Sequence, residues 1–153
     1  MKKLAFLLAT AIAALAGVNT ASAQTVNWSG SYQVQNSASA EVEKTVVTFP
    51  GNALLPESSS IPAGLSGFLT LSGFTTSGTV FSNSFVYENA DRTKGCVFTT
   101  LGIYNRRLAR YSYTFSATSL NKTNGPAPIC DLQNKEVSPT TGVFSITAII
   151  SGF

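Results

Sequence analysis

LARYSYTFSAT, residues 108–118, alternates between two kinds of side chain along its whole length. The residues between Arg, Ser and Thr are apolar or aromatic, and they are Ala109, Tyr111, Tyr113, Phe115 and Ala117. A period of two places these two sets on opposite faces of a β-strand. The stretch therefore predicts an antiparallel strand with one face in a hydrophobic core and the other in solvent.

Six further stretches have strand composition, because they are rich in Val, Ile, Phe, Tyr and Thr. Residues 96–104 are apolar on both faces and predict a central strand, joined to 108–118 by a tight hairpin. The other predicted strands are 28–35, 41–49, 67–75, 79–87 and 143–150, and 50–65 and 120–142 are predicted as long loops. We therefore predict one all-β domain over residues 24–153, an antiparallel β-sandwich of about seven strands, with a small β-barrel as the alternative.

The N-terminus has the three parts of a secretory signal peptide of bacterial style. Lys2 and Lys3 precede an apolar run over residues 4–17, and Ala-Ser-Ala at 21–23 supplies a cleavage pattern. We predict that residues 1–23 are removed and that the protein is periplasmic, on the cell surface or extracellular. The apolar run is shorter than a bilayer span, so no transmembrane helix is expected. In an exported chain, Cys96 and Cys130 predict one structural disulfide.

Composition excludes several classes of function. The chain contains no histidine, which removes the Ser-His-Asp triad, the Cys-His pair and ordinary histidine metal sites. Glu41 and Glu43 project in parallel from one strand and do not flank a substrate. The net charge of +3 falls to +1 when the two lysines of the leader are subtracted, which is not the basic stripe of a nucleic-acid-binding protein. We predict a protein without enzymatic activity, cofactor, metal site or nucleic-acid partner.

The predicted hairpin after residue 104 holds the only concentration of positive charge in the mature chain. Its candidate binding residues are Tyr104, Arg106, Arg107 and Arg110. Arginine and tyrosine together suit an anionic glycan or a protein partner. The alternative is that Tyr111 and Tyr113 belong to the core and the arginines form a solvated tip. A second cluster consists of Glu88, Asn89 and Asp91. It predicts a polar turn, with a calcium site as the alternative.

Residues 27–32, Asn-Trp-Ser-Gly-Ser-Tyr, resemble the opening strand of small bacterial outer-membrane β-barrels, which often end in phenylalanine as this chain does at Phe153. The resemblance implies an integral outer-membrane barrel. The same residues resemble the opening of calycin barrels, which implies a small ligand. However, the minimal membrane barrel needs eight strands of about ten residues, and Phe153 is out of phase with the apolar series of 144–150. The sandwich therefore stays the leading prediction.

The functional prediction follows from the strands. Residues 143–150 are uncharged and β-prone, so this strand must be central in the fold or pair with another subunit. We predict an exported, non-enzymatic surface or periplasmic domain that binds a protein partner or self-assembles through its sheet edges, such as a subunit of a surface structure. The alternatives are a monomeric binding module for an anionic glycan or small ligand, and a small outer-membrane β-barrel.

Overall fold

The computed structural model describes residues 24–48, 59–76 and 78–153 of the 153-residue chain. The predicted leader and much of the predicted loop 50–65 lie outside the described residues. Nine strands and no helix occur in these ranges. They are β1 (Thr25–Asn36), β2 (Val42–Thr48), β3 (Ser60–Ile61), β4 (Ser66–Thr76), β5 (Val80–Glu88), β6 (Lys94–Asn105), β7 (Arg110–Asn121), β8 (Ile129–Ser138) and β9 (Val143–Ser151).

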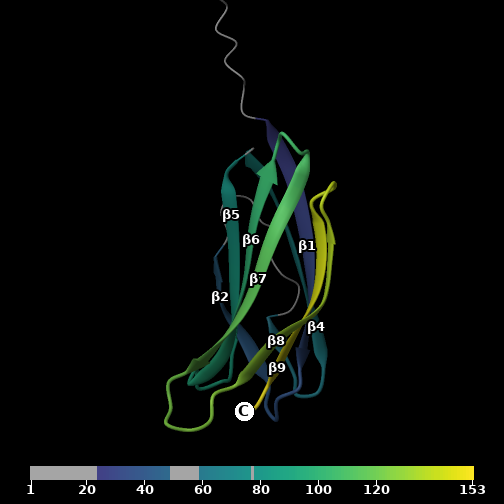
Figure 1. Cartoon of the computed structure of the whole chain (residues 1–153). Helices are drawn as coiled ribbons and strands as arrows, with labels where there is room; N and C mark the ends of the chain where they lie inside the picture. Colours follow the sequence, from purple (N-terminus) through teal and green to yellow (C-terminus); the bar gives the residue numbers. More distant parts are fainter. Residues whose placement is uncertain (1–23, 49–58, 77) are drawn as a thin grey trace, which may run out of the picture.

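The strands form two sheets, which Figure 1 shows packed against each other. One sheet has four strands in the order β4-β1-β9-β8, and the other has five in the order β3-β2-β5-β6-β7. Both sheets are open and are not closed into a barrel, which confirms the predicted sandwich rather than its barrel alternative. Neighbouring strands are antiparallel except β1 and β9, which are parallel. These two strands are joined by most of the chain, so no short hairpin constrains their direction.

The core lies between the sheets and consists of alternate residues of facing strands. On β7, Tyr111 is buried, whereas Ser112 and Thr114 are exposed, as predicted. The half-buried residues that follow on the core face are Tyr113, Phe115 and Ala117. Ala109 is the exception, because it lies in the exposed turn before β7 with a φ of 49°. The largest fully buried side chains are Tyr32, Tyr87, Phe85, Phe98 and Phe144.

Residues 120–142 were expected to be a loop, and this expectation is wrong, because β8 occupies half of them. The strand pairs with β9, but its register shifts between Gln133 and Glu136, where Asn134 has a φ of 48°. This bulge interrupts the alternation that marks a strand in sequence. The short β3, which pairs with β2, likewise lies within the predicted loop 50–65.

The predicted disulfide is present, and it joins the two sheets. Cys96 on β6 is fully buried and is bonded to Cys130 on β8, with 5.7 Å between the two Cα atoms. The bond therefore ties an edge strand of the four-stranded sheet to a central strand of the five-stranded sheet. This is a structural arrangement, since it fixes how the layers pack.

The uncharged C-terminal strand is central. β9 pairs with β1 on one side and with β8 on the other. Of the two alternatives predicted for residues 143–150, burial within the sheet is therefore correct, and no second subunit is needed to cover this strand. Among the described residues, the outermost strands of this sheet are β4 and β8.

Candidate functional site

The predicted Tyr/Arg hairpin lies at one end of the sandwich, at the top in Figure 1. Arg106, Arg107 and Arg110 are exposed in and beside the turn between β6 and β7. Tyr104 is buried with 8% exposure, and its ring lies 4.8 Å from that of Tyr111. The structure therefore keeps the three arginines together on the surface and places Tyr104 in the core.

Two tyrosines of β7 connect the sheets at the same end. The hydroxyl of Tyr111 donates a hydrogen bond to the carbonyl of Asn27, and that of Tyr113 donates to the carbonyl of Gly142 at 2.7 Å. Burial raises the pKa of both phenols, and a nearby tyrosine raises it further: Tyr104 acts on Tyr111, and Tyr111 acts on Tyr113. These side chains hold β1 and the β8–β9 turn against β7, which is a structural role.

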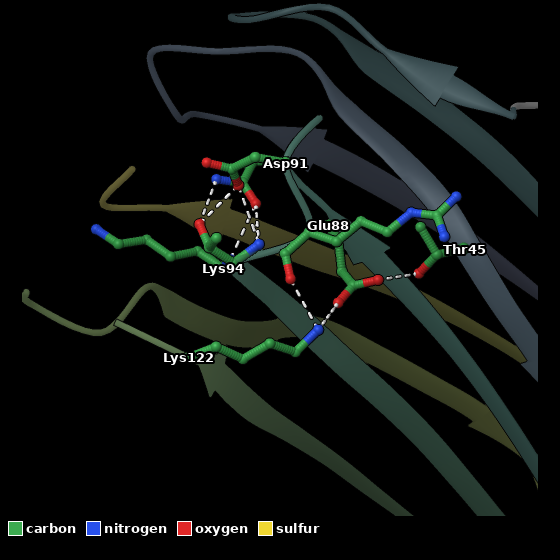
Figure 2. A network of polar contacts seen from close by, with 8 residues as sticks. Thr45, Glu88, Asp91, Lys94 and Lys122 are labelled. Atoms are coloured by element: carbon green, nitrogen blue, oxygen red, sulfur yellow. Dashed lines mark hydrogen bonds and ion pairs between the residues drawn. The ribbon is translucent and has the colours of Figure 1, made fainter. Parts of the chain in front are cut away.

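The buried Glu88 lies at the end of β5, at the opposite end of the five-stranded sheet. Figure 2 shows the polar contacts around its carboxylate. Its Oε2 accepts a hydrogen bond from the Thr45 hydroxyl at 2.5 Å, and its Oε1 accepts one from Lys122 Nζ at 3.1 Å. Lys122 Nζ also donates to the carbonyl of Arg92 at 2.7 Å. Burial by itself raises the pKa of Glu88, but these hydrogen bonds and the nearby positive charges lower it below its ordinary value.

The neighbouring Asp91 closes the turn between β5 and β6. Its Oδ1 accepts hydrogen bonds from the hydroxyl and the backbone N–H of Thr93, which lower the pKa of Asp91. The side-chain oxygen of Asn89 accepts from the backbone N–H groups of Thr93 and Lys94. Of the residues that sequence reasoning considered for calcium, Asn89 and Asp91 each use a side-chain oxygen to fix the turn, and Glu88 binds Thr45 and Lys122. Among the described residues, no three His, Cys, Asp or Glu side chains gather as a metal site.

The two edges of the four-stranded sheet differ in charge. β8 carries Asp131, Lys135 and Glu136, whereas β4, with sequence SGFLTLSGFTT, has no charged residue and no proline. Within the described chain, the ladder partner of β4 is β1 alone, and their register runs without a shift from Thr25↔Thr76 to Gln35↔Ser66. Phe68 and Phe74 project from the outer face of β4 with 54% and 52% exposure.

An open cavity of about 450 Å³ lies over the ends of three elements, β1, β4 and the β8–β9 turn. Its lining residues are Asn27, Trp28, Ser29, Ser72, Gly73, Phe74 and Thr141. Sequence reasoning missed this cavity, although it singled out residues 27–32, which supply three of the lining residues. The Trp-containing opening of β1 and the repeated Ser-Gly-Phe of β4 pair directly, with Trp28 opposite Gly73.

Nothing in the described chain forms a helix that is long and apolar enough to cross a bilayer. No protein-family model and no curated protein sequence matches the chain, so its function is argued from its own geometry.

Proposed function

We propose that this protein is an exported, non-enzymatic surface or periplasmic subunit that assembles through the edge strand β4 with β4 of a second copy. The observation that carries the proposal is the composition of that edge: β4 has eleven residues without charge or proline, on the outside of its sheet. An edge of this kind offers backbone N–H and C=O groups for strand addition. Because it has no charge, two copies meet without like-charge repulsion.

The sequence of β4 is self-complementary in an antiparallel register centred on Leu71. In that register Phe68 of one copy lies opposite Phe74 of the other, and Thr70 lies opposite Ser72. Phe68 and Phe74 both project from the outer face, so the two-fold axis generates two identical aromatic pairs. Cross-strand aromatic pairs contribute roughly 0.2–1 kcal/mol each. The contact is isologous and closes as a dimer.

A charge on the edge tests the proposal. In Thr70→Lys, the new lysines of the two copies occupy diagonal positions whose backbones are roughly 7–8 Å apart, so two like charges are brought close together. We expect the dissociation constant of the dimer, measured by sedimentation velocity over a range of concentrations, to rise roughly tenfold or more. Thr70 is exposed, so the fold tolerates the lysine.

Gln33→Lys is the matched control, because it adds the same charge to the same face of the sheet on the central strand β1. This variant is expected to dimerise like the wild type. A wild-type protein that stays monomeric at every concentration, or two lysine variants with equal dissociation constants, would contradict assembly through β4.

The Arg106, Arg107 and Arg110 cluster supports a second candidate function, binding of an anionic glycan. The three exposed guanidinium groups lie within one turn and at its junction with β7. Guanidinium groups bind sulfate and carboxylate groups through paired hydrogen bonds. Binding of a sulfated heparin disaccharide, but of no neutral disaccharide, would favour this arginine site over the cavity of β1 and β4.

A further inference from the structure

The cavity over β1, β4 and the β8–β9 turn combines aromatic and neutral polar groups. Its volume of about 450 Å³ falls in the range of small-molecule sites, roughly 300–1,000 Å³. Phe74, half-exposed on β4, lies opposite Asn27 on β1, so an apolar ring and an amide stand side by side at the mouth. Such a pair offers a flat apolar surface and a hydrogen-bonding group to one ligand.

The hydroxyl groups of the cavity come from three elements. Ser29 and Ser72 are direct partners in the β1–β4 ladder. Thr141 belongs to the β8–β9 turn, which is held to β1 by the hydrogen bond from Ser29 N–H to the Gly142 carbonyl at 3.1 Å. Hydroxyl and amide groups both donate and accept hydrogen bonds. The lining has no ionisable side chain, so its chemistry suits an uncharged ligand.

Trp28 borders the cavity, but its side chain lies in the core beneath it and is only 2% exposed. Its indole ring stacks on Phe81 at 4.6 Å, and its buried N–H has no hydrogen-bond partner in the described part of the chain. Gly73 lies directly against this ring, because a Cβ at that position would be 2.7 Å from Cζ2 of Trp28. Glycine is therefore required here, because a side chain on this face of β4 would collide with the buried indole.

We propose that this cavity binds a short neutral saccharide. A sugar has apolar C–H faces that stack on aromatic rings and hydroxyl groups that both donate and accept, which matches Phe74 on one side and Asn27, Ser29 and Thr141 on the other. An anionic sugar would need a positive group in the lining, and the lining has none. The proposal does not rest on assembly through β4.

Fluorescence titration tests the proposal, because Trp28 is the single tryptophan of the chain. The probes are the neutral disaccharides cellobiose, maltose and lactose, together with a sulfated heparin disaccharide. We expect at least one neutral disaccharide to change the emission of Trp28 saturably. Phe74→Ala is expected to weaken that binding roughly tenfold, since it removes the stacking ring.

Phe68→Ala is the matched control, because Phe68 lies on the same strand and face with 54% exposure but outside the cavity; both phenylalanine variants are made in the Thr70→Lys background, so that loss of the Phe68–Phe74 pair between copies does not enter the comparison. Phe68→Ala is expected to keep the wild-type affinity, and so is Thr70→Lys even where its dimer dissociates, which separates this proposal from assembly. The unfolding temperature of each variant shows that it is folded. The proposal is overturned if no neutral disaccharide changes the emission, if the two phenylalanine variants bind equally, or if only the sulfated probe binds.

Discussion

The two edges of the four-stranded sheet, β4 and β8, have opposite properties. β8 has three charged residues, a bulge with Asn134 at a φ of 48°, and a disulfide through Cys130. β4 has an unbroken ladder with β1, no charge and no proline. Charges and bulges are devices by which proteins prevent another strand from adding to an edge. The difference indicates that one edge is protected from strand addition, whereas the other keeps the features of an edge that pairs.

The largest effect on stability is expected from removing the disulfide that ties β8 to β6. In the double variant Cys96→Ala and Cys130→Ala, the loop between the cysteines, which are 34 positions apart in sequence, is no longer closed in the unfolded chain. We expect the free energy of unfolding, measured with urea, to fall by about 3–4 kcal/mol. Wild-type protein unfolded in the presence of a reductant should show the same loss. An unchanged urea midpoint would mean that the disulfide does not stabilise the contact of β8 with β6.

A smaller effect is expected at β7, an outer strand of the five-stranded sheet, whose C-terminal end is fixed by the Glu88–Lys122 pair. Glu88→Gln keeps the shape of the side chain but removes its charge, and we expect a loss of about 1 kcal/mol in the free energy of unfolding at neutral pH. The folded-state pKa of Glu88 is lowered, so its contribution is present above its ordinary pKa and is lost as pH falls through the lowered value.

The difference in stability between the wild type and Glu88→Gln should therefore be constant near neutral pH and shrink as the solution becomes acidic. Urea unfolding at a series of pH values measures it. Glu136→Gln on β8 serves as the control, because that carboxylate is exposed. A difference that grows on acidification would show that the carboxylate is not stabilised in its charged form by Thr45 and Lys122.

The strands of the two sheets were not equally predictable from the sequence. β5, β7 and β9 were located from the alternation of residues such as Phe85 and Tyr111, and β6 from its apolar residues on both faces, because the faces of these strands have a fixed environment. β8 was missed for the reason that makes it a poor pairing edge: its bulge and its charges remove the period of two. Strand order and the parallel pairing of β1 with β9 depend on contacts between distant residues, which a local pattern does not contain.

The candidate sites were also predictable only where neighbouring residues in the sequence form them. The grouping of Arg106, Arg107 and Arg110 was predictable because it lies within one turn, whereas the burial of Tyr104 depends on the packing of the core. The cavity at Phe74 was not predictable, because Thr141 reaches it from a turn more than sixty residues away along the chain. The exposed phenylalanines of the Ser-Gly-Phe repeat were its one signal in the sequence.

Amide hydrogen exchange as a function of protein concentration tests the central claim most directly. If β4 pairs with β4 of a second copy, the amides of Ser66–Thr76 become slower to exchange as concentration rises, while those of Ile129–Ser138 on β8 do not change. Protection that rises in β8 instead of β4, or in neither strand, would contradict the assignment of β4 as the edge through which the protein assembles.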